Sequence, residues 1–342
     1  MQTTEREKRT ELQERLKEYL SEDLQHVEAY LRDTLVYLQL PLPMRDILEE
    51  LLASPGKQIR PMLSLLAGRA LQADAVQMER ISHLGALLEI VHLASLVHDD
   101  VVDDAPLRRG KPTTQSKYGK NIAVYTGDFL LSRVLSALLK DKMNRSGEEI
   151  AQAVEEMCLG ETAQMQARFD ADVAEEQYLG FIRGKTVALF TAAFRIAGIE
   201  CGVSEAVLEK LTELGHCFGY VFQLRDDLKD YVSAQEEEGK AVHADIRAGY
   251  YTMPLLRALH TEQGNQIRAL LQEAQTEEGV GADAKLQQVL SLVRGTDAFS
   301  YTKERIDAYA ARGLSLLKEC ADGEAVSLME EVMTWLTKSI SA

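Results

Sequence analysis

The chain of 342 residues is acidic, with a formal net charge of −16 at pH 7. This charge argues against nucleic acid as a partner, because another polyanion would be repelled. Hydrophobic residues make up 46% of the sequence, which is ample for a buried core. The four cysteines are widely scattered and form neither a disulfide framework nor a metal-binding spacing, so a reducing cytoplasm is the expected location.

Long stretches without proline predict a chain built from long helices. Residues 113–253 contain no proline, which breaks helix interiors, and no alternating strand pattern is present. Helices are expected at residues 4–38, 43–53, 57–71, 76–103, 118–141, 146–168, 173–198, 204–231, 250–274, 283–295, 298–320 and 323–341. Loops are expected from Pro106 to Pro112 and from Glu236 to Gly249.

The sequence offers no convincing domain boundary, so one all-α domain is predicted over residues 1–342. Residues 1–22 are polar and charged, which predicts a peripheral or frayed N-terminal helix and not a signal peptide. No apolar stretch reaches the roughly 18 uncharged residues that a membrane span needs.

Two clusters of the pattern Asp-Asp-x-x-Asp lie far apart in the chain. They are Asp99-Asp100-Val101-Val102-Asp103, extended by Asp104, and Asp226-Asp227-Leu228-Lys229-Asp230. On a helix, positions i, i+1 and i+4 share one face, so each cluster gathers three carboxylates. Such a patch repels itself unless cations hold it together, and oxygen ligands of this kind suit Mg²⁺. Two facing patches would clamp a diphosphate through shared metal ions.

The alternative for each cluster is a solvated acidic face. Both clusters, however, follow apolar helical runs, at residues 84–98 and 218–224. Acidic residues at the carboxyl end of a helix oppose the helix dipole, which favours cations there. The metal-binding interpretation is therefore preferred.

Basic residues recur around the two clusters and could bind diphosphate. They are Lys57 and Arg60 in GKQIRP, Arg108 and Arg109 in RRGKP, Lys185 in GKT, and Lys240 in GK. Each pair alone is usually surface decoration. Their order around two acidic clusters favours a common role.

These motifs resemble those of the trans-isoprenyl diphosphate synthases, the polyprenyl synthetase family. The matching blocks are GKQIRP, LASLVHDDVVDDAPLRRGKPT, GDFLLS, GKT and FQLRDDLKDY, which run in family order over roughly residues 50–260. The resemblance implies an all-α fold, a single large helical bundle around a central apolar cavity. It also implies three Mg²⁺ ions per active site.

The implied reaction is a prenyl transfer. Diphosphate leaves an allylic carbon, isopentenyl diphosphate attacks the resulting cation, and loss of a proton gives an allylic diphosphate one C5 unit longer. Magnesium would act as a Lewis acid on the leaving group. No nucleophilic side chain is required.

The resemblance also implies a role for each matching residue. Asp99 and Asp103 would bind Mg²⁺ with support from Asp100, and Asp226 would hold a further metal, with Asp227 and Asp230 as ligands or supports. Lys57, Arg60, His92 and Arg109 would bind isopentenyl diphosphate; Arg108, Lys185 and Lys240 would meet the allylic diphosphate; Thr186 and Gln223 would stabilise the cation. In isolation, His92 and His98 would each be satisfied core histidines.

The sequence departs from the family pattern at two positions. Gln58 stands where many relatives carry arginine, and Gly249-Tyr250 replaces a Gly-Lys pair. The second change removes one phosphate contact. It points to weaker diphosphate binding, or to the catalytic half of a two-component synthase.

Small residues precede the first aspartate cluster and bear on product length. Ala94 and Ser95 lie one helical turn before Asp99, where farnesyl-making relatives typically carry bulky aromatic residues. With Val91 and Leu87 on the next turns, they predict an open apolar tunnel and a C30–C40 product for a quinone side chain. The alternative is that Ala94 and Ser95 merely permit close helix packing.

Three other activities stay open at this point. They are a shorter-chain geranylgeranyl or farnesyl diphosphate synthase, a terpene cyclase, and a non-catalytic partner subunit. A cyclase needs no second diphosphate site, and a non-catalytic subunit does not need two intact aspartate clusters. The expected assembly is a homodimer, or a heterodimer with a small regulatory subunit, with transient membrane contact for product release.

Overall fold

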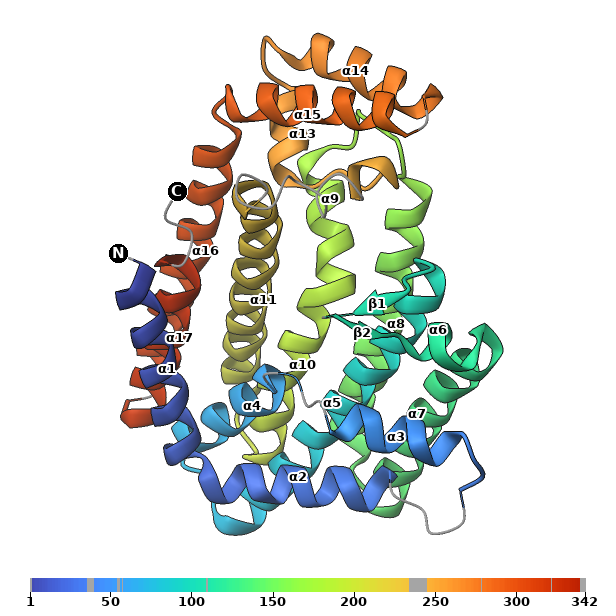
Figure 1. The fold of residues 1–342 in the computed structure, drawn as a ribbon. Helices are drawn as coiled ribbons and strands as arrows, with labels where there is room; N and C mark the ends of the chain where they lie inside the picture. Colours follow the sequence, from blue (N-terminus) through green and yellow to red (C-terminus); the bar gives the residue numbers. More distant parts are fainter. Residues whose placement is uncertain are drawn as a thin grey trace. The chain divides into compact units, whose positions relative to one another are not determined.

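The computed structural model describes residues 2–35, 40–53, 56, 58–108, 110–233, 245–277, 279–320 and 322–338. These residues are overwhelmingly helical, which confirms the predicted all-α class (Figure 1). Contacts divide the chain into two compact units. The first comprises Met1–Val154, Leu189–Thr212 and Cys320–Met329, and the second comprises Glu155–Ala188, Glu213–Glu319 and Glu330–Ala342.

The helices agree with most of the predicted ranges. From the amino terminus they are α1 (Gln2–Tyr19), α2 (Ser21–Leu35), α3 (Met44–Leu52), α4 (Ile59–Ala70), α5 (Ala75–Val102), α6 (Thr114–Tyr118), α7 (Lys120–Lys140), α8 (Asn144–Gln166) and α9 (Glu175–Ile182). They continue with a π-helical turn, η1 (Arg183–Val187), then α10 (Ala188–Glu200), α11 (Glu205–Ser233), α13 (Met253–Leu259), α14 (Gly264–Thr276), α15 (Val280–Arg294), α16 (Ala298–Cys320) and α17 (Glu324–Lys338).

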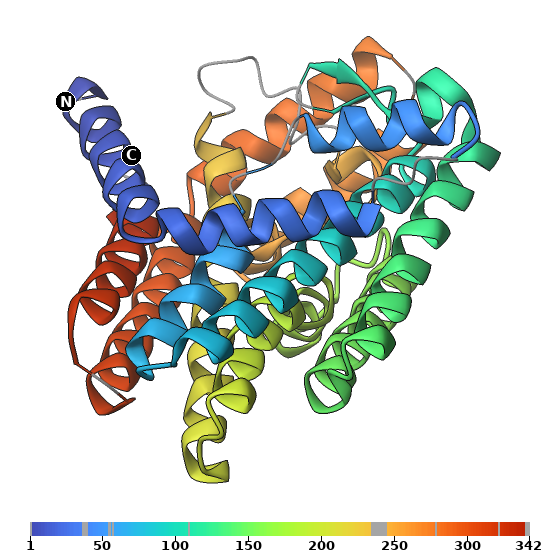
Figure 2. The ribbon, with the colours of Figure 1, turned by 90° about the horizontal axis from the view of Figure 1, so that it is seen from below.

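The core of the first unit is built around α5. Its amino end is fixed by a capping box, in which Asp74 Oδ1 accepts from the Gln77 amide and Gln77 Oε1 accepts from the Asp74 amide, both at 2.9 Å. Helices α2, α4 and α7 all pack against α5, and α2 can be followed in blue in Figure 2. Gly85 lets α4 approach closely, since a Cβ there would lie 3.3 Å from the Cα of Pro61.

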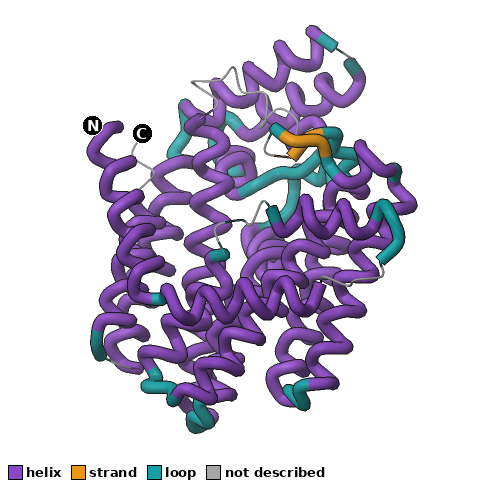
Figure 3. Tube along the Cα trace, turned by 60° about the horizontal axis from the view of Figure 1, so that its bottom comes forward, coloured by secondary structure: helices purple, strands orange, loops and turns teal. Residues whose placement is uncertain are grey.

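Three predicted helices are interrupted in the structure, and two short strands were not expected. The range 173–198 is interrupted by the π-helical turn η1. The range 4–38 divides at Leu20, because Ser21 begins a new helix with Glu22 and Asp23 in its first turn. The range 250–274 divides between α13 and α14. Strands β1 (Leu107–Arg108) and β2 (Lys111–Pro112) pair antiparallel inside the predicted loop, as Figure 3 shows in orange.

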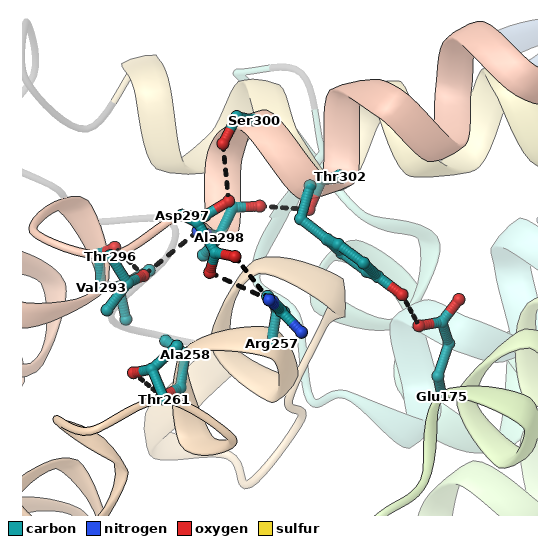
Figure 4. A network of polar contacts seen from close by, with 11 residues as sticks. Glu175, Arg257, Ala258, Thr261, Val293, Thr296, Asp297, Ala298, Ser300 and Thr302 are labelled. Carbon is teal, nitrogen blue, oxygen red and sulfur yellow. Dashed lines mark hydrogen bonds and ion pairs between the residues drawn. The ribbon is translucent and has the colours of Figure 1, made fainter.

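The second unit contains an antiparallel helix pair and a polar network. Helices α14 and α15 lie side by side (Figure 1). Arg257 of α13 donates to Asp297 at 3.1 Å, just before α16 begins, as Figure 4 shows. The Arg257 guanidinium also lies 4.4 Å from the centre of the Tyr301 ring, whose hydroxyl donates to Glu175 at 2.5 Å. This network ties the start of α9 to α13 and α16.

Two helices among the described residues, α5 and α7, are long and apolar enough to cross a membrane by length and composition alone. Neither is free of charge, since Glu89 interrupts α5 and Asp128 and Arg133 interrupt α7. Most of the apolar window of α5 is buried, as in the core helix of a soluble protein, whereas α7 is less covered.

Candidate active site

The first aspartate cluster lies at the carboxyl end of α5, with Asp103 as the C-cap residue. Asp100 is buried and accepts from Arg108 Nε at 2.8 Å, whereas Asp103 is exposed and Asp99 is half-buried. Arg108, predicted to meet the allylic diphosphate, is therefore held by Asp100 through a charge-assisted hydrogen bond. The arrangement fits the predicted supporting role of Asp100.

The exposed Asp104 forms an ion pair with Lys120 at 2.9 Å. Hydrogen bonding to Lys120 lowers the pKa of the Asp104 carboxyl. This residue extends the acidic cluster in the sequence, but its charge is already balanced by the first residue of α7.

His98 connects this cluster to α7. Its Nε2 atom lies 3.2 Å from the carbonyl oxygen of Val124 and 3.4 Å from Asp128 Oδ1. Gly127 makes room for the ring, because a Cβ at that position would overlap the imidazole. The GDFLLS block therefore positions His98, the residue before Asp99, because Gly127 leaves space for the ring and Asp128 pairs with it.

Arg60 lies near the start of α4, half-buried, with its guanidinium carbon 5.2 Å from the centre of the Phe190 ring. Burial lowers the pKa of Arg60, and the nearby Glu89 opposes that shift. The Nε atom of Arg60 is buried and makes no hydrogen bond, so its position is set by the ring and the acidic neighbour. Gln58 precedes the helix in the left-handed region at φ 47°, an uncommon conformation for a residue other than glycine.

The second aspartate cluster lies near the carboxyl end of α11. Asp226 and Asp230 are exposed, but Asp227 is only 7% exposed. Burial raises the pKa of Asp227 to about 7, against the hydrogen bonds from Tyr178 and Gln223. Asp230 is exposed as a residue, but the surrounding protein partly desolvates its carboxyl, and this desolvation, together with the charge of Asp226, raises its pKa to about 6. The cluster thus carries mutual repulsion that a bound cation would relieve.

Lys185 and Thr186 lie on the π-helical turn η1, between α9 and α10. Such turns are frequent at functional sites. Gly160 of α8 and Gly184 of η1 meet at close range, since a Cβ on Gly160 would lie 2.9 Å from the Gly184 Cα. Lys185 Nζ forms an ion pair with Glu161 Oε1 at 2.7 Å. The contact between the two glycines therefore brings the lysine beside the acidic residue of α8.

Gln223 reaches Thr186 because α11 crosses η1 closely at Gly219. A Cβ on Gly219 would lie 2.8 Å from the Val187 Cα. One turn further along α11, Gln223 Oε1 accepts from Thr186 Oγ1 at 2.6 Å, and Gln223 Nε2 donates to Asp227 Oδ1 at 2.8 Å. Tyr178 of α9 donates to Asp227 Oδ2. The structure thus joins two predicted cation-stabilising residues to the second aspartate cluster.

Each unit gathers its own part of the predicted site. The first unit holds Arg60, His92, Asp99, Asp100, Asp103 and Arg108; the second holds Lys185, Thr186, Gln223, Asp226, Asp227 and Asp230. Lys57, Arg109 and Lys240 lie outside the described residues.

Tyr250, which stands where the family pattern has lysine, packs near the side chain of Arg168. The guanidinium of Arg168 lies 5.2 Å from the centre of the Tyr250 ring. Gly249, at φ 85°, lies against Phe169, whose ring a Cβ would approach to 2.8 Å.

The predicted chain-length residues lie in the middle of α5. Ala94 and Val91 are each 1% exposed, and Ser95 is half-buried with its hydroxyl donating to the His92 carbonyl at 2.9 Å. Their small or apolar side chains are compatible with both an apolar wall and close helix packing. The predicted tunnel stays a prediction.

The carboxylates of the two clusters fit Mg²⁺, provided that water and substrate phosphates supply the remaining ligands. Within the described part of the chain, no group of three or more His, Cys, Asp or Glu side chains could by itself hold a metal ion. The carboxylates that could serve as ligands lie in pairs, Asp99 with Asp103 and Asp226 with Asp230. Magnesium in proteins commonly takes one or two carboxylates and completes its shell with water and substrate phosphates.

Several residues of the site were not predicted. Glu161 holds Lys185, Tyr178 holds Asp227, and Glu89 lies near Arg60. Tyr178 and Asp227 are 49 residues apart, and no local pattern links them. Only the buried acidic residue Glu89, inside an otherwise apolar run, gave a signal that sequence reasoning could have used.

Known proteins share sequence with most of this chain. The polyprenyl synthetase family profile matches residues 42–291. The chain is 34% identical to heptaprenyl diphosphate synthase component 2 of Geobacillus stearothermophilus over 320 residues, covering 94% of this chain and 97% of the relative. It is 35% identical to octaprenyl diphosphate synthase of Escherichia coli K12 over 272 residues, covering 78% and 81%.

Solved structures share the fold. A decaprenyl diphosphate synthase from Rhodobacter capsulatus superposes with a TM-score of 0.87 at 29% identity, covering 96% of this chain and all of that one. A polyprenyl synthase from Caulobacter crescentus, solved with calcium and isoprenyl diphosphate, gives 0.84 at 30% identity, covering 95% and 97%.

The helical fold and the two aspartate clusters, taken with these likenesses, define a prenyltransferase. The chain belongs to the polyprenyl synthetase family. The predicted family and enzyme class are confirmed.

Proposed function

We propose that this protein makes an all-trans C30–C40 polyprenyl diphosphate from isopentenyl diphosphate and an allylic diphosphate, either farnesyl or geranylgeranyl diphosphate. The observation that carries the proposal is the pair of aspartate clusters at the ends of α5 and α11, together with relatives named for hepta-, octa- and decaprenyl products. In each cycle, the allylic carbon–oxygen bond breaks and a new carbon–carbon bond forms. One proton then leaves to the released diphosphate.

The residues of the first unit would serve both substrates. Asp99 and Asp103 would hold Mg²⁺, which would supply positive charge to the leaving diphosphate, with Asp100 and Arg108 beside them. Arg60 and His92 bind isopentenyl diphosphate, together with Lys57 and Arg109. Arg60 suits this role because its Nε atom has no hydrogen-bond partner in the protein.

The residues of the second unit would serve the allylic substrate. Lys185 and Lys240 meet its diphosphate, and Asp226 and Asp230 hold a further metal ion. Thr186 and Gln223 present oxygens to the allylic cation. Three Mg²⁺ ions per active site are proposed. The calcium ion named with isoprenyl diphosphate in the Caulobacter structure supports a divalent cation.

A partner chain is proposed to cover the outer face of α7. Val124, Tyr125, Leu135 and Leu139 are exposed along this helix, from 39% to 75%. The segment from Ser132 to Leu139 carries one charge, Arg133, whose Nε donates to the Thr34 carbonyl. Asp128 lies on the same face between Tyr125 and Leu135 and is paired with His98 at 3.4 Å, and the segment beyond it can pack against its own copy without charge repulsion, which favours a homodimer.

A heterodimer is the alternative assembly, and the two relatives named "component 2" favour it. Light scattering of the purified chain would decide, with Leu135→Glu and Leu139→Glu as interface variants. We expect a wild-type dimer and monomeric variants. A monomeric wild-type chain that becomes active only with a second protein would support the heterodimer.

The two compact units are proposed to form one functional domain in the cytoplasm. Each unit is assembled from three separate segments, and the family match spans both. The product would leave through transient contact with a membrane, because its hydrocarbon tail is insoluble in water.

Product analysis with labelled isopentenyl diphosphate and farnesyl diphosphate tests the proposal. A synthase gives a labelled chain of six to eight C5 units. Cyclic hydrocarbon without isopentenyl incorporation would indicate a terpene cyclase, and a chain that stops at C15 or C20 would indicate a shorter-chain synthase. No turnover at any Mg²⁺ concentration, either by the purified chain alone or with a second subunit added, would favour a non-catalytic subunit.

A further inference from the structure

A buried hydrogen-bonded chain in the second unit connects three elements of the fold. Tyr178 of α9 donates to Asp227 Oδ2, Gln223 of α11 donates to Asp227 Oδ1, and Thr186 of η1 donates to Gln223. Tyr178 and Asp227 are 1% and 7% exposed. Both carboxylate oxygens are thus occupied by protein donors, whereas those of Asp226 and Asp230 face solvent.

The direction of each hydrogen bond follows from the chemistry of the groups. Tyr178 donates to Asp227 Oδ2, and Gln223 Nε2 lies 2.8 Å from Asp227 Oδ1, so the amide nitrogen of Gln223 faces Asp227 and donates to it. The amide oxygen then faces Thr186, whose hydroxyl hydrogen is consumed in that bond. Lone pairs on both Thr186 Oγ1 and Gln223 Oε1 stay available. Asp227 therefore fixes the orientation in which these two residues present oxygen and not hydrogen.

Tyr178 completes the arrangement at the other end. The Asp227 carboxyl is buried, and a buried polar group needs hydrogen-bond partners to stay in one position. Tyr178 is locked by burial in α9, a different helix from Gln223 and Asp227. It therefore supplies an anchor that does not depend on the rotamers of α11.

We propose that Tyr178 is a positioning residue that, through Asp227 and Gln223, holds the oxygens of Thr186 and Gln223 toward the allylic cation. The proposal rests on the prenyl transfer described above. It makes Asp227 an anchor of the cation-stabilising oxygens, in contrast to the proposed metal ligands Asp226 and Asp230. Preorganised dipoles lower a barrier only when they are held in place before charge develops.

The test is Tyr178→Phe, which removes one hydroxyl and keeps the ring. Turnover of farnesyl and isopentenyl diphosphates should show kcat lowered by about 10- to 100-fold. Both KM values and the Mg²⁺ concentration for half-activation should stay within about twofold, because the diphosphate and metal ligands are untouched. Tyr309→Phe, which removes a hydroxyl from α16 of the same unit, is the matched control and should leave kcat unchanged.

A double-mutant cycle separates positioning from general support of the fold. In the Gln223→Leu variant, the hydrogen-bonded chain from Tyr178 to Thr186 is already interrupted. Adding Tyr178→Phe to this variant should therefore change kcat by less than about twofold. Equal losses in both backgrounds would overturn the proposal, as would a Tyr178→Phe enzyme with wild-type kcat. If Tyr178→Phe does not fold, as shown by loss of the wild-type circular dichroism spectrum, a second variant is needed. Gln223→Glu then tests the direction of the hydrogen bond between residue 223 and Asp227.

Two carboxyl groups at this distance cannot both be ionised, so Gln223→Glu would share one proton with Asp227, and the direction of the hydrogen bond between them would no longer be fixed. We therefore expect kcat to fall in Gln223→Glu. A wild-type kcat in Gln223→Glu would contradict the proposal. Failure of the wild-type chain to incorporate isopentenyl diphosphate, both alone and with a second subunit added, would instead contradict the proposed function.

Discussion

At the scale of single residues, neighbouring aspartates of one motif occupy opposite environments. Asp227 is buried and hydrogen-bonded to Tyr178 and Gln223, while Asp226 and Asp230, on the same helix, are exposed. The same division separates Asp100, bound to Arg108, from the exposed Asp103. In each cluster, one carboxylate supports the surrounding protein and the others are accessible to cations.

The raised pKa of Asp227 predicts how stability changes with pH in the absence of divalent metal. Its pKa rises from 3.8 to about 7 on folding, so the folded state binds the proton more tightly. The stabilisation is therefore complete below about pH 4 and is lost as the pH rises through 7. Chemical denaturation with chelator present should show roughly 2–4 kcal/mol less stability at pH 8 than at pH 4.5 from this group. Asp227→Asn should flatten that dependence, whereas a dependence equal to wild type would contradict the assignment.

Arg60 and Lys185 are proposed to bind different substrates, so replacing each of them should affect the use of a different substrate. Arg60→Ala should raise the KM for isopentenyl diphosphate by about 10-fold or more with a smaller change for the allylic substrate, because a charge-assisted phosphate contact is lost. Lys185→Ala should mainly impair use of the allylic diphosphate. Steady-state kinetics with each substrate varied in turn would measure both, and the reverse pattern would show that the assignments are exchanged.

At the scale of elements, close helix crossings place the functional side chains. Gly127 seats His98 between α5 and α7, and Gly184 brings η1 against α8. These contacts use the absence of a Cβ where a neighbouring residue occupies the space. Motifs that carry no chemistry of their own, such as GDFLLS, thus determine where the chemical groups lie.

Gly127→Ala should therefore be costly. The added methyl group would overlap the His98 ring and force it from Val124 and Asp128, which should lower the free energy of unfolding by about 1–3 kcal/mol. Gly180→Ala, in α9 with no atom within 4 Å of the new Cβ, is the control. It should instead stabilise by about 0.5–1 kcal/mol. Equal effects of the two substitutions on denaturant midpoints would show that the His98 ring does not need the space left by Gly127.

The sequence predicted helices and motifs well where the signal was local. The i, i+1, i+4 spacing of the aspartates and the absence of proline are properties of short stretches. The division between α13 and α14 was missed although Gly264 marks it, and β1 and β2 are too short for an alternating pattern. Pairs such as Tyr178 with Asp227, and Lys185 with Glu161, depend on packing between distant segments and were not predictable.

At the scale of the whole molecule, the small residues of α5 predict product length. Ala94→Phe or Ser95→Phe should shorten the product by blocking the proposed tunnel beside α5, while the first condensation continues. Chromatography of the dephosphorylated products would measure this. An unchanged length in Ala94→Phe, or a wild-type product no longer than C20, would mean that these residues serve helix packing alone.

The proposed role of the two aspartate clusters is tested most directly by the turnover numbers of Asp99→Ala and Asp226→Ala at saturating Mg²⁺. The clusters are proposed to hold the metal that neutralises the leaving diphosphate, so each variant should lose at least about a thousandfold in kcat. Asp104→Ala, whose carboxylate is paired with Lys120, should stay within a few-fold of wild type. Chelation should abolish wild-type turnover and Mg²⁺ should restore it. Near-normal turnover by either Asp99→Ala or Asp226→Ala would contradict the central claim.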